Sequence, residues 1–270
     1  MSRRWLLWSL AVLITLGSLM VQRMTGPTYP FRGTVEINNQ QYRYSLPRSH
    51  DQAKNCPVVL SIKDPQVHGL LSYRRLNAGE PWTTTPMVVT EEGLSGELPL
   101  QPTAGKLQYH IELEVNGQKQ RVGGVENPIV IRFRHEVPVV IVLPHVLTLF
   151  LSFLFAIAAG LKAAFKQEGA KRLAWIGVIF FAIGGFLFGP LMQKFAFDVY
   201  WTGLPFGWDL TDNKTLIAMA FWIIALIMNH KEERPVWILL AVIVMLIVFM
   251  IPHSLLGSQL DYSTMKVKSG

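Results

Sequence analysis

Five apolar runs and one region of alternating polar and apolar residues divide this chain. The first run covers residues 5–21 and has no charged side chain; the others cover residues 137–165, 173–192, 215–228 and 236–251. An apolar run of about 17–25 residues is long enough to cross a bilayer as a helix. The pattern predicts five membrane spans.

Between the first two runs, apolar and polar residues alternate with the period of two that is typical of half-buried strands. The clearest case is residues 106–115, where Leu107, Tyr109, Ile111, Leu113 and Val115 fall on one face. Asn116 and Gly117 follow, a strong signal for a tight hairpin turn into residues 118–122. Further strands are expected at 34–37, 41–46, 58–62, 70–76, 87–90 and 129–133. Short strands separated by turns, without a helical pattern, favour a β-sandwich of immunoglobulin-like size.

The predicted fold class is therefore a membrane α-helical bundle plus an all-β domain, immunoglobulin-like in architecture. We expect an N-terminal signal anchor at 1–23, a β-sandwich at 24–136, a four-helix transmembrane domain at 137–256 and a polar C-terminal tail at 257–270. The first run leaves through Leu19, Met20, Val21, Gln22 and Arg23, a poor site for signal peptidase. We expect the anchor to stay uncleaved.

Charge sets the predicted orientation. Lys and Arg gather in the loops at 166–172 and 229–235, and Arg3 and Arg4 precede the first run. The positive-inside rule then puts these loops and the N-terminus in the cytoplasm, and the sandwich and the C-terminus outside. In a bacterium the protein would lie in the inner membrane, with the sandwich in the periplasm.

Composition limits the functions to consider. Charged residues make up 16% of the chain, against about 25% in soluble domains. The net charge is +7, but Lys and Arg form no stripe that would bind nucleic acid. We therefore expect the lipid bilayer to be one partner and nucleic acid not to be one. The single cysteine, Cys56, excludes an intramolecular disulfide.

The connector at residues 194–214 separates the third and fourth spans and is the first place to look for a site. It carries six aromatic residues, including Tyr200, Trp201 and Trp208. These aromatics form either an interfacial belt or the mouth of a site for a lipid or another apolar ligand. Asp209 and Asp212 precede the fourth span, where they either cap the helix or line a polar vestibule for a cation or a quinone-like head group.

Two histidines are predicted at the same membrane face as the connector. His145 lies at the outer end of the second span and His253 at the outer end of the fifth. With oxygen ligands from Asp209 and Asp212 they would form a metal site, or the two histidines alone would hold a haem. The alternative is that both are interfacial side chains, half wet and half buried.

The function expected from this pattern is non-catalytic. Apart from the ends of the spans, the membrane segments lack ionisable residues, which argues against a proton-coupled transporter. The leading hypothesis is an accessory, assembly or scaffold subunit of a membrane complex, whose β-sandwich binds a partner protein and whose bundle contacts other membrane subunits. The alternatives are a metal- or haem-binding redox-associated protein and a lipid-modifying membrane enzyme.

Overall fold

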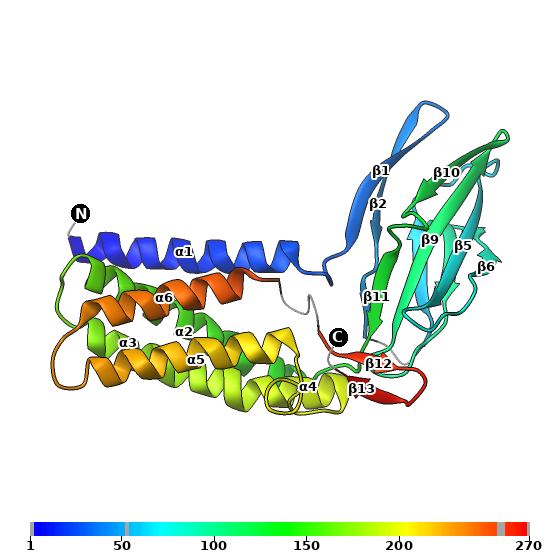
Figure 1. Ribbon diagram of the computed structural model, residues 1–270. Helices are drawn as coiled ribbons and strands as arrows, with labels where there is room; N and C mark the ends of the chain where they lie inside the picture. The colour runs from blue at the N-terminus through cyan, green and yellow to red at the C-terminus, as the bar shows by residue number, and fades with distance from the viewer. Residues whose placement is uncertain (1–2, 52–53, 253–256, 269–270) are drawn as a thin grey trace. The chain divides into compact units, whose positions relative to one another are not determined.

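The computed structural model describes residues 3–51, 54–252 and 257–268 (Figure 1). The chain forms two compact units. The first consists of Met1–Pro27 and Val137–Ser258, and the second of Thr28–Glu136 and Gln259–Lys268. Over the described residues, the chain therefore passes between the units at three points: after Pro27, after Glu136 and after Ser258.

The first unit is helical. Its segments are α1 (Arg3–Thr25), α2 (Val139–Ala164), α3 (Ala170–Ala182), a π-helical segment (Ile183–Phe188), α4 (Gly189–Phe197), α5 (Leu210–Met228) and α6 (Pro235–Met250). Among the described residues, four helices are long and apolar enough to cross a membrane: Trp5–Thr25, Val139–Ala164, Ala170–Phe197 and Leu210–Met228. α6 is also apolar but shorter, with 16 residues. The chain thus has the features of a multi-pass membrane protein.

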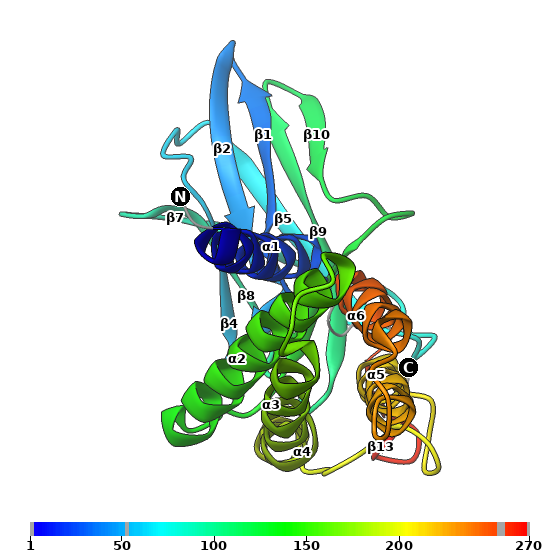
Figure 2. The same ribbon diagram turned by 90° about the vertical axis from the view of Figure 1, so that its left-hand side faces the viewer.

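Helix α2 is the centre of the bundle, because it packs against α1, α3 and α6 (Figure 2). A Cβ atom at Gly177 of α3 would lie 3.1 Å from the Ala156 nitrogen of α2, so the glycine permits this close approach. The largest buried side chains of the bundle are Phe153, Phe181 and Trp222. Small residues at helix contacts are usual in the packing of membrane helices.

The second unit is built from β-strands. They are β1 (Phe31–Ile37), β2 (Gln40–Leu46), β3 (Ser49–His50), β4 (Cys56–Leu60), β5 (His68–Arg75), β6 (Thr83–Pro86), β7 (Val88–Thr90), β8 (Gly93–Leu98), β9 (Lys106–Val115), β10 (Gln118–Val122), β11 (Ile129–Phe133), β12 (Gln259–Asp261) and β13 (Lys266–Lys268). The larger sheet has the order β3-β11-β9-β5-β6, with β10 also paired to β9, and the smaller has the order β4-β8-β7. β1 pairs with β2, and β12 with β13.

The two sheets share one apolar core. Strand β9 contributes Leu107, Tyr109, Ile111 and Leu113, each 0–1% exposed, as the alternation predicts. Its turn to β10 has positive φ at both Asn116 (50°) and Gly117 (76°), the conformation that an Asn-Gly hairpin favours. β4 contributes the Cys56 thiol to this core, and burial raises the pKa of that thiol to about 12.

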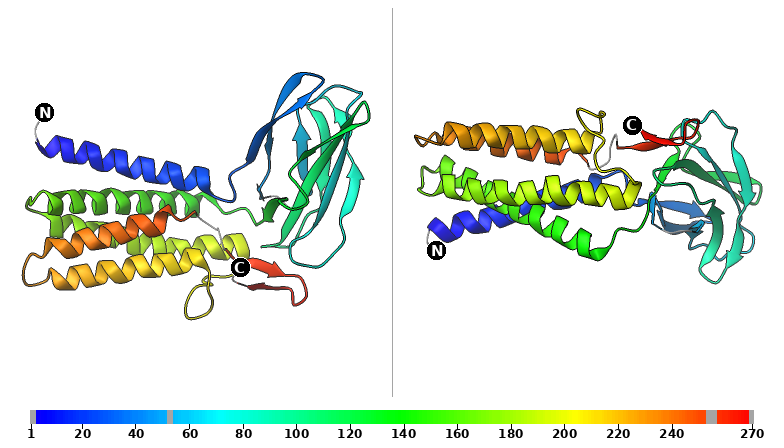
Figure 3. Two further views of the ribbon diagram at one scale, coloured as in Figure 1. Left: turned by 45° about the horizontal axis from the view of Figure 1, so that its top comes forward. Right: turned by 90° about the horizontal axis from the view of Figure 1, so that it is seen from below.

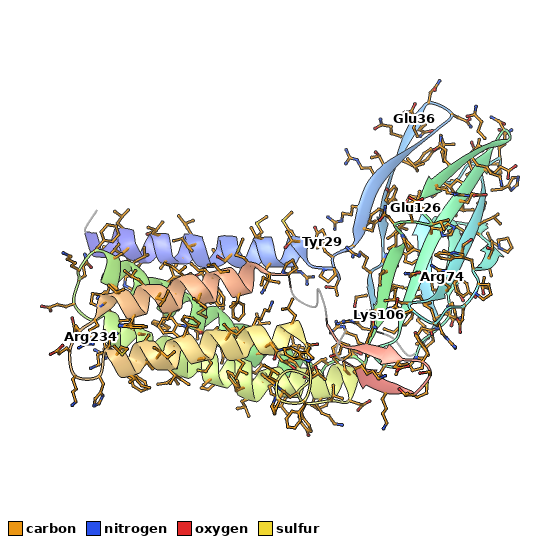
Figure 4. All side chains as sticks on the ribbon, in the orientation of Figure 1. Tyr29, Glu36, Arg74, Lys106, Glu126 and Arg234 are labelled. Atoms are coloured by element: carbon orange, nitrogen blue, oxygen red, sulfur yellow. The ribbon has the colours of Figure 1, made fainter. Side chains whose placement is uncertain are left out.

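A C-terminal hairpin belongs to this unit, where the sequence indicated only a polar tail. The Leu260 nitrogen donates to the Ala104 carbonyl oxygen at 2.9 Å. The Tyr262 hydroxyl accepts from the Lys106 nitrogen at 3.1 Å, and Lys106 lies beside the hairpin in Figure 4. The Arg75 guanidinium lies over the Tyr262 ring, 4.9 Å from its centroid. β12–β13 is thus tied to the larger sheet by backbone and side-chain contacts.

Candidate functional site

The 194–214 connector begins at the end of α4 and closes against the start of α5. α4 ends at Phe197, and Asp198 follows in the left-handed conformation that ends helices. The chain then loops through residues 199–209, drawn in yellow in Figure 3, and enters α5 at Leu210. The polar side chains of the connector meet at this helix start.

Asp209 is the N-cap of α5, one of the two roles considered from the sequence. Its Oδ1 accepts from the backbone nitrogens of Thr211 (2.8 Å) and Asp212 (3.4 Å). Its Oδ2 accepts from both the backbone nitrogen and the hydroxyl of Ser258, each at 2.8 Å. Asp209 is 2% exposed, so a carboxylate that caps one helix also holds the chain beyond α6.

Asp212, in the first turn of α5, binds the loop that precedes the helix. Its Oδ2 accepts from the backbone nitrogens of Thr202 (2.7 Å) and Gly203 (3.0 Å). The same oxygen also accepts from the Thr202 hydroxyl (3.2 Å) and from Nε2 of Gln193 on α4 (3.1 Å). Backbone donors that would otherwise be buried without a partner are satisfied by this carboxylate.

Lys214 completes the cluster from the next turn of α5. It is 2% exposed, and its ammonium donates to the carbonyl oxygen of Ile251 at 2.9 Å. Ile251 directly follows α6, where the last carbonyl groups of the helix lack helical partners and attract a cation. The ammonium also lies 5.7 Å from the centroid of the Phe249 ring. Lys214 therefore fastens the end of α6 to the start of α5.

We call this cluster the α5 clasp; it consists of Gln193, Thr202, Asp209, Asp212, Lys214 and Ser258. It joins α4, the connector loop, α5 and the segment after α6. Both carboxylate oxygens of Asp209 and the Oδ2 of Asp212 accept hydrogen bonds from other groups of the protein. The arrangement is that of a structural fastening.

The aromatic side chains of the connector divide into two groups. Tyr200, Phe206 and Trp208 are exposed, with Trp208 74% exposed. Trp201 instead stacks on Phe186, with ring centroids 5.8 Å apart, and its indole nitrogen donates to the Leu204 carbonyl oxygen. The interfacial-belt interpretation of these aromatics stays a prediction. The ligand-mouth alternative for Tyr200, Trp201 and Trp208 stays a prediction.

His145 lies against the π-helical segment Ile183–Phe188. Its Nδ1 donates to the Gly184 carbonyl oxygen at 3.1 Å, because a carbonyl oxygen can only accept. This bond fixes the ring and leaves Nε2 as the nitrogen with a free lone pair, as in many metal-ligating histidines. His253 lies outside the described residues. Among the residues that are described, no group of three or more His, Cys, Asp or Glu side chains is placed to hold a metal ion. The metal or haem site stays a prediction.

Sequence reasoning included Asp209 and Asp212 but missed Gln193, Thr202 and Ser258 as their partners. It also missed the bond from Lys214 to Ile251. The sequence signal for Lys214 is its place one turn inside an apolar helix, where a lysine needs an acceptor. Thr202 and Ser258 have no such signal, because single hydroxyl residues in loops are common. Only the fold brings residues 193, 202 and 258 to the start of α5.

Comparisons with known proteins identified no relative of this chain. No protein-family model, no curated protein and no solved structure matches this chain.

Proposed function

We propose that this protein is a non-catalytic accessory or assembly subunit of a membrane complex. In this proposal the β unit is an extracytoplasmic, immunoglobulin-like sandwich that binds a partner protein, and the helical unit holds it at the membrane. The orientation follows the positive-inside rule, with the N-terminus in the cytoplasm.

The observation that carries the proposal is the exposed apolar edge strand β7. It is the last strand of the smaller sheet and pairs only with β8 among the described strands. Val88 and Val89 are 62% and 51% exposed, so both faces of this strand present an apolar side chain. An open apolar edge is normally protected by charge, by a bulge or by a covering segment. The strand of a partner, added to β7, would supply that cover.

The α5 clasp supports a non-catalytic role. Both carboxylate oxygens of Asp209 accept hydrogen bonds, one from the start of α5 and the other from Ser258. The Lys214 ammonium donates to the carbonyl oxygen of Ile251 at the end of α6. A general acid or base needs a group that is free to exchange a proton with substrate. Asp209, Asp212 and Lys214 instead act as helix caps and loop anchors. Stoichiometric metal or a haem absorption band in the purified protein would favour the redox alternative.

The proposal predicts that charges placed on β7 dissociate the complex. The Val88→Lys/Val89→Lys variant should lower the fraction of the protein in its complex by about tenfold, because the added charges block strand addition. The measurement is native gel electrophoresis after extraction of native membranes in mild detergent.

The matched control is Gln118→Lys/Gln120→Lys, which adds the same charge to β10, whose residues at 118 and 120 are exposed. This variant should keep the complex. Wild-type protein that migrates as a lone monomer, or equal losses in both variants, would contradict the proposal.

A further inference from the structure

A groove in the helical unit opens between α3 and α5 at the end of the bundle that carries the 229–234 turn. Its volume is about 740 Å³. The apolar walls come from Trp175 and Val178 on α3 and from Ile223, Leu226 and Ile227 on α5. Ile227 is 66% exposed and Trp175 47% exposed. Because Met228 ends α5 and α3 begins only five residues before Trp175, the groove lies at the ends of both helices.

The polar end of the groove is a turn of fixed shape. Asn229 is 1% exposed; its side chain donates to the carbonyl oxygens of Ala225 (2.8 Å) and Arg234 (3.1 Å). Its Oδ1 accepts from the Arg234 nitrogen at 2.7 Å. These hydrogen bonds hold the turn in one conformation without a ligand, so binding would not carry the entropic cost of ordering the turn.

This turn gives the groove a cationic rim. Lys231 and Arg234 both line the groove, and Arg234 stands at the tip of the bundle in Figure 4. Lys171 of α3 adds a third cation, because its ammonium donates to the His230 carbonyl oxygen at 2.8 Å. The lining contains one acid, Glu232, which pairs with Arg234 at 3.3 Å. Lys231 and Arg234 against Glu232 give the lining a net charge of +1, and the sum stays at +1 when Lys171 and Glu233 of the same turn are both counted.

We propose that this groove binds an anionic phospholipid of the bilayer. One acyl chain lies along the apolar walls formed by α3 and α5, and the phosphate meets Lys231 and Arg234. Apolar walls that end in a cationic rim at helix ends complement a molecule with an apolar tail and an anionic head. Basic pockets between membrane helices recognise anionic head groups in this way. Trp175 stands at the boundary, where an indole ring favours the head-group layer.

A membrane helix of a partner protein is the other occupant that the apolar walls would fit. It would not need the rim charges, because lipid-exposed helix contacts depend on apolar packing and small residues. Removing the rim charges should therefore weaken the binding of an anionic lipid but not the binding of a partner helix. The proposal does not depend on the β unit or on its partner.

The test is native mass spectrometry of the full-length protein in detergent, titrated with phosphatidylglycerol and with phosphatidylcholine of the same acyl chains. The wild-type protein should bind phosphatidylglycerol at least about tenfold more tightly, because each cation near the head group contributes about fivefold. Lys231→Gln/Arg234→Gln should remove most of this preference. Glu232→Gln should increase it, because a negative charge leaves the rim.

The matched control is Lys166→Gln/Arg172→Gln, which removes two cations from the neighbouring α2–α3 loop and the start of α3, outside the groove lining. It should keep the preference of the wild-type protein. Equal binding of the two lipids by the wild-type protein would overturn the proposal. So would a preference that survives the loss of Lys231 and Arg234, or one that the control loses to the same extent.

Discussion

Replacing Asp212 by alanine should lower the free energy of unfolding of the helical unit by about 4 kcal/mol. The substitution leaves the backbone nitrogens of Thr202 and Gly203 without the acceptor that they have in the clasp. Each buried donor left unpaired costs about 1–3 kcal/mol. The Gln193 amide loses the same acceptor. The measurement is equilibrium unfolding of the purified protein in detergent, followed by tryptophan fluorescence.

The Asp212→Asn variant is the control for this prediction. An asparagine of nearly the same shape keeps one acceptor oxygen for the two backbone donors but carries no charge. Its loss should be smaller, about 1–2 kcal/mol, because hydrogen bonds to an ionised acceptor are stronger than neutral ones. An Asp212→Ala variant as stable as the wild type would show that the clasp does not hold the bundle.

Replacing Gly93 by alanine should destabilise the β unit by about 3 kcal/mol or more. Gly93 starts β8 with φ of 129°, a region that L residues rarely adopt. A Cβ atom there would overlap the Leu60 carbonyl oxygen and lie 2.9 Å from the Ile62 nitrogen. Both obstacles are backbone atoms and cannot rotate away. Backbone strain of this kind alone costs about 1–3 kcal/mol, and the overlap adds to it.

The Gly117→Ala variant separates the cost of backbone strain from the cost of the atomic overlap. Gly117 also has positive φ, 76°, but a Cβ atom added there would have no neighbouring atom within 4 Å. This variant should lose only about 1 kcal/mol, the cost of the left-handed conformation. The single cysteine, buried in the same core, reports the result, because its thiol reacts with a disulfide reagent only when the β unit opens. Equal thiol labelling in the two variants would contradict the prediction.

The parts of the fold that could be predicted are those with a strong local pattern. Strands β9, β10 and β11 have the predicted bounds, because alternation and the Asn116–Gly117 turn determine them within a few residues. The long apolar helices follow from run length in the same way. The N-cap role of Asp209 was one of two candidates, since an acidic residue directly before an apolar helix has a known local use.

The parts that could not be predicted depend on contacts between distant residues. Strands β3 and β6 are short and polar, and their partners in the sheet come from β11 and β5. The β12–β13 hairpin has only three residues in each strand, and its place beside Lys106 follows from the Tyr262 hydroxyl. His110 alternates with the apolar residues of β9 but is only 6% exposed, because the Trp82 ring covers it with ring centroids 4.6 Å apart.

The same distinction applies to the candidate site. The aromatics and carboxylates of the connector stand out by composition, so the sequence indicates where to look. Their roles depend on residues that carry no signal of their own, such as Thr202 and Ser258. For Lys214 the sequence indicates that an acceptor is needed but does not identify it, since the acceptor lies 37 residues away at Ile251.

The most direct test of the proposed function is photo-crosslinking from β7 in living cells. A photoreactive phenylalanine analogue at position 88 should form an adduct with one partner protein, and the same analogue at position 118 on β10 should not. The Val89→Lys substitution, combined with the analogue at 88, should remove the adduct. If position 88 yields no adduct, or the same products as position 118, β7 does not bind a partner and the scaffold account fails.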